Sequence, residues 1–97
     1  MYALRVRINQ LPAVIAGAND LGALSAIVSC VGKLGSAAVA HSDDETPDFT
    51  IRVGGLTSRP KPATDEHLLW LSRKQLRPGD IVTVELIETK SADYQQQ

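Results

Sequence analysis

Two short runs in which apolar and polar residues alternate constrain this chain more than any other feature. The first run is Phe49 to Val53 and the second is Ile81 to Glu88. Successive side chains of a β-strand point to opposite faces, so each run predicts a strand with one apolar face in a core. The side chains expected to face inward are Phe49, Ile51, Val53, Val82, Val84 and Leu86.

Three further strands follow from the same pattern. Leu4, Val6 and Ile8 alternate with polar residues, and Val14 to Ala16 predicts a short return strand after the Leu11-Pro12 interruption. His67 to Ser72 is apolar and aromatic enough for another strand. Leu76 to Asp80 predicts a turn, since Pro78 presets one central position and Gly79 accepts a positive φ at the next.

The segment Leu21 to Leu34 has two interpretations, and the fold class depends on which is correct. As a helix it carries an apolar stripe at three- and four-residue spacing, with Asp20 as N-cap and Gly35 as the stop. As a strand it places Leu24, Ala26, Val28 and Cys30 on one face. The β-branched run Ala26 to Val31 favours the strand.

The fold class that we predict is all-β, a small antiparallel sandwich or partly open barrel of five to six strands. If residues 21–34 are helical instead, the fold becomes α+β. The length of 97 residues is enough for a single domain, spanning 1–97. Residues 89–97 are polar and are expected to form a peripheral tail.

Net charge, cysteine content and the length of the apolar runs limit the classes of function that this chain can have. The net charge of −1 gives no global field that favours nucleic acid or an acidic membrane. The single cysteine, Cys30, excludes an internal disulfide, and its apolar surroundings predict a buried, inert thiol. No export signal is apparent and the longest apolar run, Leu21 to Gly32, is too short to span a membrane. The expected location is the cytoplasm.

The stretch from Gly35 to Asp48 is predicted to be the longest loop, and it ends in the acidic cluster Asp43, Asp44, Glu45 and Asp48. This cluster has the charge for calcium but lacks the EF-hand spacing, so a solvated loop is the preferred interpretation. We expect neither a metal nor another cofactor.

Three motifs resemble a family of small uncharacterised bacterial proteins. They are Val53-Gly54-Gly55-Leu56-Thr57-Ser58, Glu66-His67-Leu68-Leu69-Trp70 and the closing run Leu76 to Val84. They match the GGLxS, EHLxW and LxxGDxVTV patterns of that family. The resemblance implies a fold type and a bacterial cytosolic origin, and it brings no mechanism with it.

Five residues of the Gly54–Trp70 region are candidate binding residues: Gly54, Gly55, Glu66, His67 and Trp70. The paired glycines would let backbone N–H groups approach an anion, although a bulge or bend at a strand end explains them more simply. His67, beside Asp65 and Glu66, suggests an acid–base pair, but no convergent catalytic set accompanies it. Ser58 with His67 is the only arrangement that resembles a serine hydrolase, and the nucleophile motif is missing.

The function that we predict is therefore a non-enzymatic protein-interaction or accessory domain, with a protein partner or self-association. Its surface would be a sheet face or the Gly54–Trp70 region, because Trp70 is either a core ring or an exposed anchor. The first alternative is a small-molecule or anion binder, or an enzyme, that uses Gly54, Gly55 and His67. The second is a weak nucleic-acid binder through Arg5, Arg7 and Arg52, if the first and fourth strands pair.

Overall fold

The computed structural model describes residues 1–39 and 46–96, which form six strands and no helix. The strands are β1 (Tyr2–Ile8), β2 (Val14–Ala16), β3 (Leu21–Val31), β4 (Asp48–Thr57), β5 (His67–Gln75) and β6 (Val82–Glu88). The all-β prediction is confirmed. The helical alternative for 21–34 is wrong, because residues 21–31 form β3, which pairs with β4 along its length.

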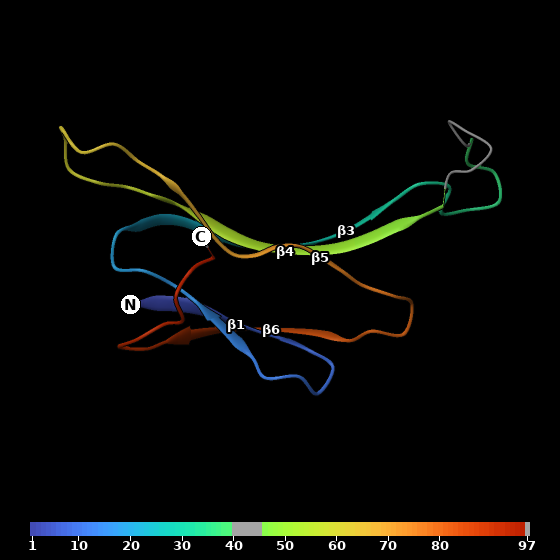
Figure 1. Ribbon diagram of the computed structural model, residues 1–97, viewed down its shortest axis with the longest axis horizontal. Coiled ribbons are helices and arrows are strands. Elements are labelled where there is room, and N and C mark those ends of the chain that lie inside the picture. The colour runs from blue at the N-terminus through green and yellow to red at the C-terminus, as the bar shows by residue number, and fades with distance from the viewer. Residues whose placement is uncertain (40–45, 97) are drawn as a thin grey trace.

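The strands form two antiparallel sheets of three strands each, in the orders β2–β1–β6 and β3–β4–β5. Figure 1 shows the two sheets facing one another as two layers, without closing into a barrel. The register of β1 places Val6 opposite Val14 on one side and Val84 on the other, so the apolar face predicted from alternation continues across the sheet. The fold is a small sandwich.

The core lies between the layers and contains the predicted inward side chains of β1 and β4. Val6, Ile51 and Val53 are almost fully buried. Trp70 and Leu76 join the same cluster, and Phe49 packs against it. Aliphatic side chains thus supply most of the core, as the shortage of aromatic residues requires.

Strand β4 continues through Gly54 and Gly55 to Thr57, so the expectation that the glycines end this strand is wrong. A Cβ at Gly55 would collide with the carbonyl oxygen of Ala23, and one at Gly54 would lie 2.9 Å from the carbonyl oxygen of Leu68. The glycines therefore let both neighbouring strands approach β4 closely. The predicted irregularity is present, because the register between β4 and β5 shifts between Val53 and Gly54.

Strand β6 follows the predicted turn, in which Gly79 has φ of +96° and the Asp80 N–H donates to the Arg77 carbonyl at 3.0 Å. Its register puts Val84 opposite Val6 and Leu86 opposite Leu4, on the inward face. However, Val84 is 45% exposed and Leu86 76% exposed. The expectation that both side chains are in the core is wrong, because β6 lies at an edge of its sheet.

The C-terminal segment 89–96 joins the two sheets on the side of β2 and β5. The Asp93 carboxylate accepts from the Ile15 N–H of β2 at 2.8 Å, while the Asp93 carbonyl accepts from the Trp70 indole of β5 at 2.9 Å. The Gln96 N–H donates to the carbonyl of Leu69 at 2.6 Å. This polar segment is peripheral, yet it bridges the two layers at Ile15, Leu69 and Trp70.

Candidate interaction surface

The opposite long side of the sandwich, bounded by the edge strands β3 and β6, leaves part of the apolar interior exposed. We call it the β3–β6 side and define it by the inward residues Val28 and Cys30 of β3 and Val84 and Leu86 of β6. Val28 is 53% exposed and Cys30 is also exposed. The prediction of a buried thiol is therefore wrong, since the β2–β1–β6 sheet does not cover this end of β3.

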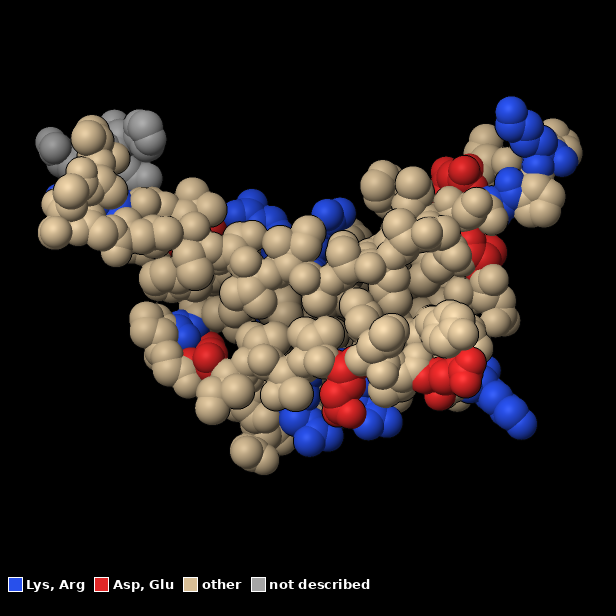
Figure 2. Space-filling model, turned by 180° about the vertical axis from the view of Figure 1, so that it is seen from behind, with Lys and Arg blue, Asp and Glu red and all other residues tan. Residues whose placement is uncertain are grey.

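Figure 2 looks onto this side of the molecule. Lysine, arginine, aspartate and glutamate lie mainly along its upper and lower margins, and between the layers a basic and an acidic group lie together at the left of the view, beside a broad uncharged area. The apolar side chains left exposed on the inward face of β3 and β6 are Val28, Val84 and Leu86, while Ile27 and Val31 are exposed on the outer face of β3. A concentration of exposed apolar side chains on one side is typical of a surface that binds another macromolecule.

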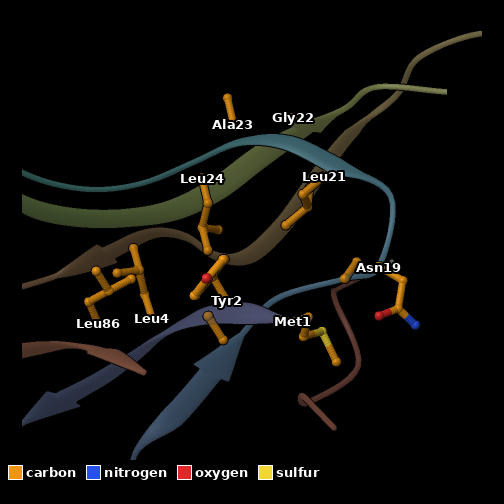
Figure 3. Close-up of a pocket in the computed structure, with 11 residues that line it drawn as sticks. Met1, Tyr2, Leu4, Asn19, Leu21, Gly22, Ala23, Leu24 and Leu86 are labelled. Atoms are coloured by element: carbon orange, nitrogen blue, oxygen red, sulfur yellow. The ribbon is translucent and has the colours of Figure 1, made fainter. Parts of the chain in front are cut away.

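Two hollows follow the gap between the sheet edges. The first, of about 340 Å³, is lined by Leu4 and Leu86 from one sheet and by Leu21 and Leu24 from the other (Figure 3). The second, of about 400 Å³, lies at the other end and is lined mainly by apolar side chains, including Val28, Phe49 and Val82. The two layers therefore separate at both ends of this side.

The free edge of β3 is unusual for its length and its lack of charge. It spans 11 residues and carries no charged side chain, and its outer edge pairs with no strand in residues 1–39 and 46–96. Exposed edges in natural proteins are normally short, charged or interrupted by proline, because an unprotected edge recruits other strands. This edge has none of these three protections, and its register shift lies at the start of the strand, between Leu21 and Ala23.

Trp70 is a core residue and not an interface anchor. Its side chain is 3% exposed and its indole N–H is bonded to Asp93. The ring therefore offers no exposed surface to a partner, because the C-terminal segment lies against it. Replacing Trp70 by alanine would test the core rather than partner binding.

Gly54, Gly55 and His67 do come together, around a hollow of about 190 Å³ on the β3–β4–β5 sheet. Ser25 and Arg52 line the same hollow. The hollow lies on the outward face of the sheet, the face to which Arg52 points. The volume is below the roughly 300–1,000 Å³ of typical ligand pockets, so only a small ion or group would fit.

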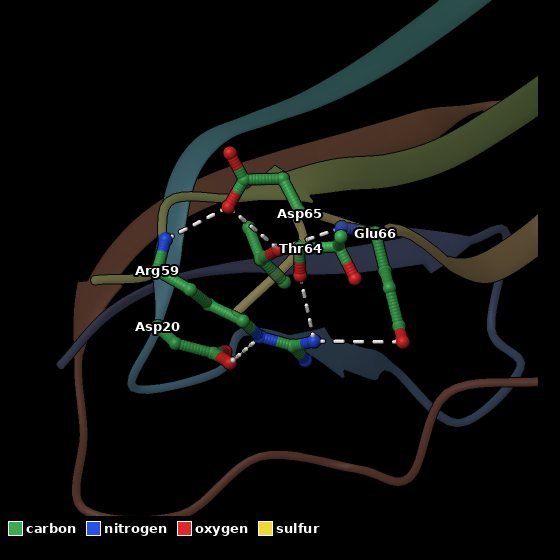
Figure 4. A network of polar contacts seen from close by, with 6 residues as sticks. Asp20, Arg59, Thr64, Asp65 and Glu66 are labelled. Atoms are coloured by element: carbon green, nitrogen blue, oxygen red, sulfur yellow. Dashed lines mark hydrogen bonds and ion pairs between the residues drawn. The ribbon is translucent and has the colours of Figure 1, made fainter. Parts of the chain in front are cut away.

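Glu66 lies outside that hollow and belongs to a polar network that holds the 58–66 loop (Figure 4). The Arg59 guanidinium donates to Asp20 at 2.8 Å and pairs with Glu66 at 3.5 Å. The hydrogen bond from Arg59 lowers the pKa of the Asp20 carboxyl. Asp65 accepts from the Arg59 N–H at 2.8 Å and from the Thr57 hydroxyl at 3.4 Å. These acidic groups stabilise the loop, and Asp65 and Glu66 bond to Thr57 and Arg59 and not to His67.

The basic patch predicted from Arg5, Arg7 and Arg52 does not form. It required β1 and β4 to pair, but the two strands belong to different sheets. Arg5 and Arg7 alternate with the buried Val6 and Ile8, so they face outward from one layer, while Arg52 faces outward from the other. Arg5 also pairs with Glu85 at 3.6 Å.

The acidic cluster lies largely outside the described residues, which do not include Asp43, Asp44 and Glu45. Asp48 accepts hydrogen bonds from Arg73 at 3.1 Å and Gln75 at 3.0 Å. In residues 1–39 and 46–96, no group of histidine, cysteine, aspartate and glutamate side chains is arranged to hold a metal ion. The same residues contain no helix long and apolar enough to cross a membrane.

Comparison with known proteins adds no relative. No family model matches the chain, and no curated protein or solved structure is similar to it. The resemblance to small bacterial proteins therefore stays a prediction, and the candidate surface rests on its geometry alone.

Sequence reasoning placed the binding region around Gly54 and Trp70 and missed the β3 edge. A signal was present, because no charged residue occurs between Asp20 and Lys33. The alternation of β3 predicted which side chains share a face, but it could not predict that β3 lies at an edge.

Proposed function

We propose that this chain is a non-enzymatic protein-interaction domain that binds its partner through the β3–β6 side. The observation that supports the proposal is that inward-facing apolar side chains remain exposed beside a long, uncharged strand edge. A reducing, cytoplasmic location is part of the proposal, since an exposed free thiol at Cys30 suits such a compartment.

The binding mode that fits this surface is strand addition. An added strand would bond to the outward N–H and C=O groups of β3, and its side chains would fill the hollows beside Val28 and Leu86. Main-chain bonds would supply part of the affinity, and the apolar contacts would supply the rest.

A matched pair of charge substitutions on β6 tests the surface. Leu86→Glu places a carboxylate on the β3–β6 side, whereas Thr83→Glu adds the same charge on the outward face, opposite Arg7. Each tagged variant and the wild type would be used to capture proteins from a lysate of the source organism, with quantitative mass spectrometry. We expect one or more proteins to be captured by the wild type and the Thr83→Glu variant and lost with Leu86→Glu. Equal capture by all three would contradict the proposed surface.

A second candidate function uses the small hollow around Gly54. Arg52, His67 and Ser25 give it cationic and hydrogen-bonding groups, which suits a small anion such as phosphate. Binding to the folded state would raise the melting temperature of the wild type, and Arg52→Gln would remove that increase. An unchanged melting temperature at millimolar phosphate would eliminate this candidate.

A further inference from the structure

The sequence of β3 is nearly the same in both directions around Ile27. On either side of this residue stand Ala26 and Val28, then Ser25 and Ser29, then Leu24 and Cys30, then Ala23 and Val31. Each pair matches in character: two serines, or two apolar residues. An edge strand with this symmetry is suited to pair with a copy of itself.

Two identical edge strands can extend one sheet only if they run antiparallel around a two-fold axis perpendicular to the sheet. Such an axis leaves each side chain on the same face of the joined sheet. Facing residues of antiparallel strands also share a face, so one residue must lie at the axis, opposite the same residue of the second copy. With Ile27 on the axis, Ser25 opposes Ser29 of the second copy and Leu24 opposes its Cys30. Serine–serine and apolar cross-strand pairs stabilise antiparallel strands.

Charge supports the same arrangement. Asp20 and Lys33 are the nearest charged residues on either side of β3. In an antiparallel pair, the Asp20 end of one strand lies beside the Lys33 end of the other, and like charges are kept at opposite ends. A parallel pairing would bring each charge beside its own copy.

The other strand edges are less suited to this contact. β2 has three residues, β5 carries Arg73 and Lys74 and makes a bridge with Gln96, and β6 carries Glu85 and Glu88. Short length and charge are the features that discourage edge pairing. β3 is the edge without them.

The available area is sufficient for a stable dimer. Eleven residues at about 3.3 Å each give an edge about 36 Å long. Two layers about 10 Å apart, with their side chains, give the side a height of roughly 20 Å. The footprint is on the order of 700 Å², close to the roughly 800 Å² per partner of a standard interface.

We propose that the partner is a second copy of this chain, bound by antiparallel pairing of the two β3 strands with Ile27 on the two-fold axis. The two β3–β4–β5 sheets would join into one six-stranded sheet. The β6 strands of the two copies would then approach on the same side, so that Val84 and Leu86 are covered. This inference rests on the proposed function and specifies its partner.

The mass of the full chain in solution tests self-association. Sedimentation velocity from about 1 to about 200 µM covers the affinities expected for an interface of this size, and we expect a species of twice the 10.4 kDa chain mass. Ile27→Lys, at a position 46% exposed in the single chain, puts two ammonium groups face to face on the axis. It should raise the dissociation constant about tenfold or more. The matched control is Leu56→Lys, which changes an exposed residue of β4, one strand in from the edge, and should leave the dimer intact.

Disulfide cross-linking tests the register. In a Cys30→Ser background, Ile27→Cys should give a covalent dimer under mild oxidation, because residues on the axis face each other within the Cα separation that a disulfide needs. Ser25→Cys in the same background should not, since the two copies of residue 25 would lie about 13 Å apart along the strands.

The outcomes separate this inference from the proposed function. A monomer at every concentration overturns self-pairing, while loss of capture of a different protein by Leu86→Glu would still support the proposed surface. A dimer that is unaffected by Ile27→Lys and does not cross-link at residue 27 overturns the β3 pairing. If the wild type is monomeric and Leu86→Glu changes no capture, both proposals fail.

Discussion

Single atoms determine where the strands of the β3–β4–β5 sheet can approach one another. Gly55 lies against the Ala23 carbonyl of β3, and Gly54 against the Leu68 carbonyl of β5. Asn9 and Asp80 hold the segment just before β6. The Asn9 side-chain N–H donates to the Asp80 carboxylate at 2.9 Å, and Asn9 Oδ1 accepts from the Ile81 N–H at 2.9 Å. These contacts are local, but each joins segments that are distant in the sequence.

Gly55→Ala should destabilise the fold. The added methyl group meets the Ala23 carbonyl and the Leu21 side chain, so β3 must move or the strands must separate. We expect the free energy of unfolding to fall by about 1–3 kcal/mol, measured by urea denaturation. The control is Gly35→Ala, where nothing lies within 4 Å of the added Cβ, and its effect should stay within about 0.5 kcal/mol. Equal stability of the two variants would show that β4 does not need the close approach.

Asp80 should make stability depend on pH in the acid range. Hydrogen bonds from the Asn9 amide and the Arg77 N–H lower the pKa of this carboxyl below its ordinary value of 3.8. As pH falls below 3.8, the unfolded chain takes up the proton first, so this stabilisation is complete above that value and is lost as pH falls through the lower folded pKa. Asp80→Asn should therefore lower the melting temperature at pH 6, with a smaller difference from the wild type at pH 3. Circular dichroism at both pH values measures this, and a constant difference would contradict it.

Among the elements, the C-terminal segment is the one whose role differs most from its appearance. Residues 89–97 are polar and lack an apolar pattern, yet Asp93 bonds to both layers of the sandwich. The segment supplies the acceptor for the buried indole N–H of Trp70. Without it, the side of β2 and β5 would resemble the open β3–β6 side.

A chain ending at Lys90 should be less stable than the full chain. Removing Asp93 leaves the buried Trp70 N–H without its acceptor, which costs about 1–3 kcal/mol. A double-mutant cycle with Trp70→Phe tests the cause, since phenylalanine has no N–H to leave unsatisfied. The phenylalanine change should cost less in the shortened chain than in the full chain. Purely additive unfolding energies, measured by urea denaturation, would show that this hydrogen bond does not stabilise the fold.

At the scale of the whole molecule, the sandwich is asymmetric. One long side is bridged by the C-terminal segment, and the other exposes Val28, Cys30 and Leu86 between two edge strands. A copy bound at β3 would give the second side the cover that the chain provides for the first. The asymmetry has a chemical reporter, because Cys30 is the only thiol and lies on the open side.

The reactivity of Cys30 should depend on protein concentration. In the single chain the thiol is exposed and should react readily with iodoacetamide. In the proposed dimer the thiol lies opposite Leu24 of the second copy, so alkylation should slow as the dimeric fraction of the protein increases. Alkylation measured by mass spectrometry should slow with concentration for the wild type and for Leu56→Lys, whereas Ile27→Lys should need about tenfold or more higher concentration for the same slowing. A rate independent of concentration in all three would contradict burial of this side.

The sequence by itself determined the strands, because alternation and turn residues are local properties. The inward faces of β1 and β4, the hairpin to β2 and the turn at Pro78-Gly79 all follow from residues within a few positions of each other. The β-branched run in β3 likewise favoured the strand over the helix.

Only the tertiary structure decided which of these strands became edges. Alternation predicted that Val84, Leu86 and Cys30 share faces with core residues, but burial requires a second layer over them, and the strand order leaves them at the margin. Strand order also separated Arg5 and Arg7 from Arg52, and it placed Asp93 against Trp70. These outcomes depend on pairings between distant segments, which the side-chain pattern of one strand does not specify.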